Sequence, residues 1–205
     1  MAKKKDGDGK VYANDEFMAR ARKEGRVRND EISMKAIDAD TSLQARVNNI
    51  DMDHVRALNE ILRNGQSLAP IVVFEIEELK KKAVVRTFKI ADGFHRHAVY
   101  RKEGLPAIPC VVVKGTIQEA VEYAAAANQT LSLGRKREDV KKAVFMLLEN
   151  GWMHRSSPLI ARQVGVSQPT VDKYRAEFCT AKQIAVPEKL LTASGEMRTR
   201  RRKLS

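Results

Sequence analysis

The chain has 205 residues, of which 43% are hydrophobic and 31% charged, and its formal net charge is +12. This length allows one good hydrophobic core or two small ones. The positive excess is concentrated in the last 71 residues, which hold 16 Lys and Arg against 7 Asp and Glu, while the first 134 hold 22 against 19. Such a local excess favours a polyanionic partner, and nucleic acid rather than a membrane surface.

The sequence has neither a membrane signature nor a disulfide signature. No apolar run approaches the roughly 18 residues of a spanning helix, and no signal peptide is recognisable. We therefore expect a soluble, cytoplasmic protein. The two cysteines are Cys110, in an apolar run, and Cys179, at the end of a predicted helix. Packing explains them better than a disulfide or a zinc site does.

Residues 1–31 are charged and poor in apolar side chains, which is typical of a mobile arm. Within this arm, residues 15–24 favour a short helix. We expect the fold to start near Ile32. The first predicted helix of the folded part spans 51–65, because an aspartate cap precedes an apolar face and a glycine ends it.

The middle of the chain alternates between strand and helix patterns. Two strands flank a charged turn and predict a hairpin, a glycine turn then leads into a helix, and a buried strand and a capped helix follow. These segments are 70–76, 83–91, 93–104, 108–113 and 117–129. We therefore predict an α+β or α/β domain with a small mixed sheet over residues 32–134.

A glycine and three consecutive basic residues, at 134–137, mark the predicted boundary between two domains. Beyond it, residues 138–150 have the apolar periodicity of an amphipathic helix. We expect an all-α DNA-binding domain over 135–193. Residues 194–205 lack apolar periodicity and carry five basic side chains, which predict either a phosphate-seeking tail or a solvated end.

The stretch 157–178 has the residue pattern of a DNA-reading helix-turn-helix. Gly165 stands where the chain must turn sharply, and Ser167 and Pro169 suit the cap and first turn of the second helix. The residues expected to face inward are Ile160, Ala161, Val164, Val166, Val171 and Tyr174. The polar residues left on the outer face of the second helix are Gln168, Thr170, Lys173 and Arg175. An ordinary helical hairpin is the alternative.

We expect the first three of these polar residues to contact bases and Arg175 to contact a phosphate. Further phosphate contacts are expected from basic runs on either side of the predicted motif. These runs are Arg135, Lys136 and Arg137 before it, and Arg200, Arg201 and Arg202 after it. Duplex DNA is the predicted partner, and a second copy of the chain is a further candidate partner.

A candidate anion site lies at residues 91–97, where a predicted strand passes through Gly93 into a helix N-terminus. Backbone N–H groups there attract phosphate, and Arg96 in the first turn adds a bidentate donor. The alternative is a simple corner, in which Arg96 pairs with a carboxylate such as Asp92 or Glu103 and no ligand binds.

Catalytic and metal signatures are weak. His95 and His97 are two residues apart on a helix, so they point to different faces and do not chelate one metal ion. The region around Asp92 offers no second carboxylate for two-metal chemistry, and no Walker loop or Ser-His-Asp order appears. We therefore predict no catalytic residue and no metal ligand. A nuclease or a nucleoside triphosphatase is the alternative.

Residues 32–178 resemble the N-terminal and central domains of ParB proteins of plasmid and chromosome partition, in the ParB/sulfiredoxin superfamily. The residues that carry the resemblance are Gln44 and Arg46, the step from Gly65 to Pro70 into a strand, Gly93 with Arg96, Ile108 with Pro109, and Asn128. The resemblance implies a ParB-like N-terminal domain followed by a helix-turn-helix domain. It also implies a site for a nucleoside triphosphate with Mg²⁺, contacted by Gly93, His95, Arg96 and Asn128.

Departures from the family pattern limit what the resemblance implies. In partition ParB proteins the glycine is followed by an acid and two arginines, and only Arg96 survives of these. The family's Glu-Asn pair is Ala127 and Asn128 here, and its following arginine is Leu131, which puts CTP turnover in doubt. Sulfiredoxin chemistry is excluded because Phe94 stands where the catalytic cysteine should be.

These observations favour a non-enzymatic, ParB-like DNA-binding protein of plasmid or phage type, acting as a partition accessory or a transcriptional regulator. The rival interpretations are a ParB-like nuclease or nucleotide hydrolase, and an adaptor that binds a protein through its α/β half.

Overall fold

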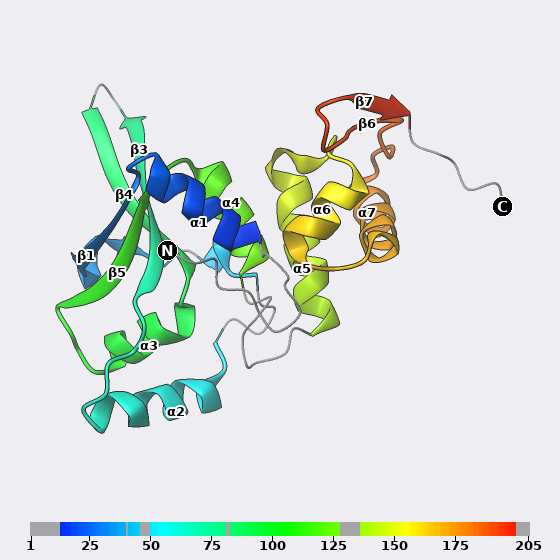
Figure 1. Ribbon diagram of the computed structural model, residues 1–205. Coiled ribbons are helices and arrows are strands. Elements are labelled where there is room, and N and C mark those ends of the chain that lie inside the picture. The colour runs from blue at the N-terminus through cyan, green and yellow to red at the C-terminus, as the bar shows by residue number, and fades with distance from the viewer. Residues whose placement is uncertain (1–12, 40, 46–49, 81–82, 128–135, 200–205) are drawn as a thin grey trace.

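The computed structural model describes residues 13–39, 41–45, 50–80, 83–127 and 136–199. Figure 1 shows an N-terminal part built around a β-sheet and a C-terminal part built mainly of helices. The helices are α1 (Ala13–Lys23), α2 (Met52–Arg63), α3 (Phe94–Lys102), α4 (Ile117–Ala126), α5 (Arg137–Leu147), α6 (Ser157–Val164) and α7 (Gln168–Lys182). The strands are β1 (Val27–Ser33), β2 (Ile37–Asp38), β3 (Ile71–Lys80), β4 (Ala83–Asp92), β5 (Ala107–Lys114), β6 (Lys189–Leu191) and β7 (Met197–Thr199).

The N-terminal part contains a five-stranded mixed sheet with the strand order β1-β5-β3-β4-β2. β3 and β4 form the predicted antiparallel hairpin, while β5 joins β3 in parallel. The central strands are apolar because both faces of the sheet are covered, and Ile71, Val73 and Phe74 are fully buried. The prediction of a small mixed sheet in an α/β domain is confirmed.

Two predicted helix starts are confirmed in their capping geometry. The carboxylate of Asp51 accepts hydrogen bonds from the backbone N–H groups of Asp53 and His54 at the start of α2. Both bonds lower the pKa of the Asp51 carboxyl, and the bond from His54 has the larger effect. Thr116 and Glu119 form a capping box at the start of α4.

The prediction of a mobile arm over residues 1–31 is wrong for residues 13–31. The ring of Phe17 in α1 lies 5.8 Å from the rings of both Phe74 and Tyr123, and Ala21 is fully buried. β1 follows and pairs antiparallel with β5. The fold therefore starts well before Ile32. The segment is rich in polar residues because α1 buries only two residues and β1, at the edge of the sheet, buries only Ile32.

The C-terminal part packs α5, α6 and α7 around a core that includes Leu147, Ile160 and Val171, all fully buried. A short turn joins α6 to α7, and Gly165 adopts the left-handed conformation there, with φ of 75°. Of the six residues expected to face inward, all but the half-buried Val166 are buried. None of the described helices is long and apolar enough to cross a membrane.

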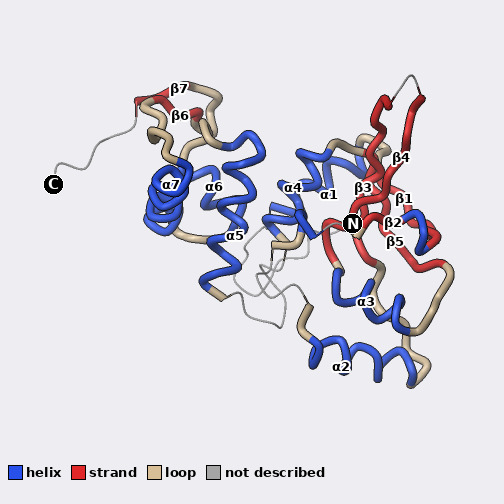
Figure 2. The backbone as a smooth tube through the Cα atoms, turned by 180° about the vertical axis from the view of Figure 1, so that it is seen from behind, coloured by secondary structure: helices blue, strands red, loops and turns tan. Residues whose placement is uncertain are grey.

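Residues 194–205 were predicted to be a basic tail or a solvated end, and the structure shows that residues 197–199 within them form β7, which pairs antiparallel with β6. Figure 2 shows this hairpin beside α6 and α7. The strands are only three residues long, and their pairing with each other is a long-range feature that apolar periodicity does not reveal.

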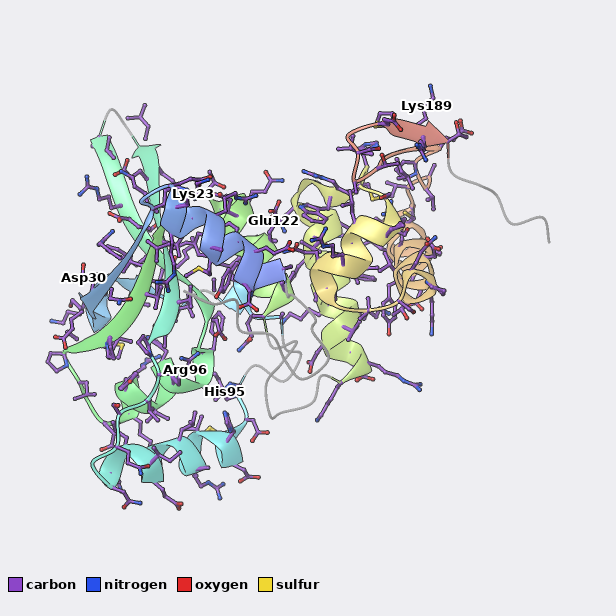
Figure 3. All side chains as sticks on the ribbon, viewed as in Figure 1. Lys23, Asp30, His95, Arg96, Glu122 and Lys189 are labelled. Atoms are coloured by element: carbon purple, nitrogen blue, oxygen red, sulfur yellow. The ribbon has the colours of Figure 1, made fainter. Side chains whose placement is uncertain are left out.

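The two parts of the chain are in direct contact through α1 and α4. The carboxylate of Glu122 accepts from the indole N–H of Trp152 at 2.8 Å, and its backbone carbonyl accepts from the side chain of Gln163 at 2.8 Å. The guanidinium of Arg162 contacts both carboxylate oxygens of Glu16 at 2.7 Å. Figure 3 shows Glu122 where α4 approaches the helical part.

Candidate nucleic-acid interface

The start of α7 presents polar side chains to solvent. Gln168 is exposed, and the side chain of Lys173 is 70% exposed, so both lie on the outer face as predicted. Thr170 is only half-buried, and its hydroxyl lies 2.8 Å from that of Ser167. Ser167 occupies the position before the helix, but its side chain makes no capping hydrogen bond to the backbone.

Arg175 is not on the outer face of α7, so the prediction of an exposed phosphate contact there is wrong. Its side chain is fully buried, and its guanidinium donates to the backbone carbonyls of Met153 and Arg155. Residues 175 and 171 lie four apart on α7, so the arginine follows Val171 into the core. Arg175 therefore fastens the loop before α6 to α7.

Asp172 is a polar residue of this surface that sequence reasoning missed. The hydroxyl of Ser157 donates to its carboxylate at 2.6 Å, and the amide of Gln168 contacts the other carboxylate oxygen at 3.4 Å. The signal in the sequence was the spacing of four residues between Gln168 and Asp172, which places them on one helix face. Asp172 thereby orients the first polar side chain of α7 and ties α6 to α7.

A groove of about 600 Å³ lies between the starts of α6 and α7 on one side and the β6–β7 hairpin on the other. Gln168 and Asp172 line it from α7, and Arg198 lines it from β7. The side chain of Arg198 is 70% exposed. The sequence groups Arg198 with the predicted basic tail, whereas in the structure it lines the same groove as Gln168 and Asp172.

Of the basic residues predicted on either side of the motif, the structure describes Lys136 and Arg137. Both are exposed at the start of α5. The backbone carbonyl of Arg137 accepts from the hydroxyl of Tyr174 at 3.3 Å, so this basic turn lies beside the middle of α7. The other predicted phosphate contacts lie outside the described residues, namely Arg135, Arg200, Arg201 and Arg202. The predicted nucleotide contact Asn128 lies outside them too.

At the candidate anion site, the chain passes from β4 through Gly93 into α3, as predicted. Gly93 adopts φ of 98°, and a Cβ atom there would lie 2.7 Å from Cγ2 of Ile71, so only glycine fits without displacement. The N-cap residue of α3 is Gly93 itself, which has no side chain to cap the helix.

Arg96 makes the ion pair that sequence reasoning held as the alternative. One terminal nitrogen lies 3.0 Å from the carboxylate of Asp92, and the other donates to the carbonyls of Ala69 and Pro70. The guanidinium thus joins the end of β4 to the chain entering β3. Glu103, the other predicted pairing partner, instead accepts from Arg63 at 2.9 Å.

The two histidines near Gly93 have different surroundings. Nε2 of His95 accepts from the backbone N–H of Asp51 at 3.0 Å, and its ring lies 5.1 Å from that of His54. Figure 3 shows His95 and Arg96 at the start of α3. His97 is buried, and this burial lowers the pKa of its imidazole. No group of three His, Cys, Asp or Glu side chains suited to a metal ion occurs among the described residues.

Comparisons with known proteins give one family match. The model of the ParB N-terminal domain matches residues 17–129. Sulfiredoxin from Arabidopsis thaliana is 26% identical and covers 47% of this chain and 96% of its own, with a TM-score of 0.36. No curated protein sequence matches the chain.

Two structures of the C-terminally truncated chromosome-partitioning protein ParB from Caulobacter crescentus are also similar. The complex with the centromeric parS site is 16% identical over 77% of this chain and 80% of that chain, with a TM-score of 0.47. The complex with CTP-γ-S is 18% identical over 72% of this chain and 77% of that chain, with a TM-score of 0.41.

Proposed function

We propose that this chain, which belongs to the ParB N-terminal domain family, binds duplex DNA through α6 and α7 acting as a helix-turn-helix. The observation that carries the proposal is the exposure of Gln168 and Lys173 in the first two turns of α7, which follows α6 after a short turn at Gly165. In this arrangement α7 enters the major groove and α6 crosses the backbone. The biological role is partition or transcriptional control.

The charge distribution supports the same surface. Residues 135–205 hold most of the net positive charge of the chain. The Tyr174 hydroxyl donates to the carbonyl of Arg137 and so keeps the exposed Lys136 and Arg137 beside α7. If α7 enters the major groove, these two side chains lie within reach of the DNA phosphates at its edge. These residues contribute affinity without sequence information, because phosphates are the same at every base pair.

Replacing Gln168 or Lys173 with alanine should cost about 1–3 kcal/mol of binding free energy on the preferred site and little on random DNA. The preferred site is obtained by selecting bound duplexes from a random pool, and affinities follow from fluorescence anisotropy. Lys182→Ala is the matched control, because Lys182 lies at the far end of α7 and pairs with Glu149. Equal losses on both DNAs would make the residue a phosphate contact.

A second proposal concerns the start of α3, which we infer to bind the phosphates of a nucleoside triphosphate. The start of α3 at Gly93, an N-cap residue without a side chain, supports it, together with Arg96, the arginine that the chain retains of the family's nucleotide motif. Arg96 must then exchange its pair with Asp92 for a phosphate oxygen. Such an exchange is feasible because both side chains are partly exposed.

A bound triphosphate should raise the melting temperature by mass action, by an amount that grows with ligand concentration. ATP, CTP and GTP are titrated with and without Mg²⁺ and DNA. Arg96→Ala should abolish the rise. Because Arg96 also holds two backbone carbonyls, this variant should melt lower without ligand, so the change on adding nucleotide is compared within each variant. Absence of any rise in the wild type would leave this part of the chain as a scaffold or a partner-binding module.

A further inference from the structure

The β6–β7 hairpin is fixed to the segment that leads into α6. The backbone N–H of Leu191 donates to the carbonyl of His154 at 2.7 Å, and the N–H of Ser156 donates back to the carbonyl of Leu191 at 2.8 Å. The side chain of Leu190 is only 7% exposed and anchors the hairpin on its apolar side. The hairpin therefore has a defined position relative to α6.

The same segment is fastened to α7 by a buried cation. The guanidinium of Arg175 holds the carbonyls of Met153 and Arg155, on either side of the residue that bonds Leu191. Three neighbouring carbonyls of this loop are thus bonded, two of them to α7 and the one between them to β6. The hairpin and α7 are consequently positioned as one unit.

The register of the hairpin directs Arg198 toward α7. Arg198 stands directly opposite Leu190 in the antiparallel pair. Residues opposite each other project from the same face of a sheet, and Leu190 faces the helical part. Arg198 accordingly lines the groove in which Gln168 and Asp172 lie. The groove has one wall from the proposed reading helix and one wall carrying an exposed cation.

We propose that the β6–β7 hairpin is a wing that contacts the DNA backbone through Arg198 while α7 occupies the adjacent major groove. This inference rests on the proposed DNA-binding function. Arg198 now pairs with Glu196 of the same hairpin at 2.7 Å, with side chains 70% and 60% exposed. An exposed pair of this kind is weak, so a DNA phosphate displaces the carboxylate readily. The occupant that this proposal assigns to the groove is a phosphodiester of duplex DNA.

The test measures how the affinity for duplex DNA depends on salt in single variants of the full chain. Arg198→Gln should reduce the steepness of log Kd against log salt by about 0.9, the value of one phosphate contact. It should weaken binding to preferred and random DNA by the same factor. Arg198→Lys should restore the wild-type slope. Glu196→Gln should tighten binding, because it removes the carboxylate that competes with phosphate.

Lys182→Gln is the control with the same change in charge, placed at the opposite end of α7. It should leave the slope unchanged. A slope that is the same in Arg198→Gln and wild type, while Lys173→Ala still weakens binding, would overturn the wing and leave the helix-turn-helix function standing. Equal changes in Arg198→Gln and Lys182→Gln would reduce Arg198 to a part of the general charge. A wild-type chain that binds no duplex would overturn both proposals.

Discussion

Replacing Arg175 with methionine should lower the free energy of unfolding of the helical part by about 2–4 kcal/mol. The side chain is fully buried, and its guanidinium donates to the carbonyls of Met153 and Arg155. Methionine fills much of the volume but leaves both carbonyls without this donor. Denaturant unfolding followed by tryptophan fluorescence measures the loss, since Trp152 is the single tryptophan of the chain and is buried in the helical part.

Lys173→Met is the matched control for this prediction. Lys173 lies on the same helix, but its side chain is 70% exposed, so its replacement should change stability by no more than about 0.5 kcal/mol. A loss of DNA affinity in Arg175→Met with unchanged stability would instead return Arg175 to the role of a phosphate contact.

The elements that could be predicted are those specified by neighbouring residues. The start of α2 at Asp51 and the capping box of Thr116 and Glu119 each depend on side chains within a few residues of the backbone groups that they satisfy. The buried strands β3 and β5 are apolar runs of a length typical of strands. The resemblance to the N-terminal domain of ParB proteins was also visible in the sequence, and the family match over residues 17–129 confirms it.

The elements that could not be predicted depend on partners distant in the chain. Phe17 makes α1 part of the fold only because Phe74 and Tyr123 come from other elements to meet it. β7 depends on β6, and β6 depends on the loop before α6. A segment of this kind looks polar and irregular in isolation, because its few buried contacts and its backbone pairing leave no local periodicity.

At the candidate site, the charge of Arg175 led to a wrong prediction that helix periodicity would have corrected. Arg175 was assigned to the outer face as a cation, although it lies four residues after Val171 and three before Phe178, both buried. Gln168 and Lys173, which were also predicted to face outward, are both exposed. For Arg96, the sequence left open a phosphate or a carboxylate partner, and the structure shows the pair with Asp92.

Binding of the chain to duplex DNA should weaken steeply with salt, because most of the net positive charge lies in the part that carries the proposed interface. If about five phosphates are contacted, the slope of log affinity against log salt should be roughly −4 to −5, which is a loss of about 500-fold between about 50 and about 200 mM salt. Fluorescence anisotropy at a series of salt concentrations measures it on preferred and random duplexes. A chain ending at Thr199 lacks the last basic run and should give a shallower slope on both duplexes, since phosphates carry no base identity. Affinity that stays constant across this salt range would contradict a phosphate-based interface, and it would require the net charge of the C-terminal part to serve another partner.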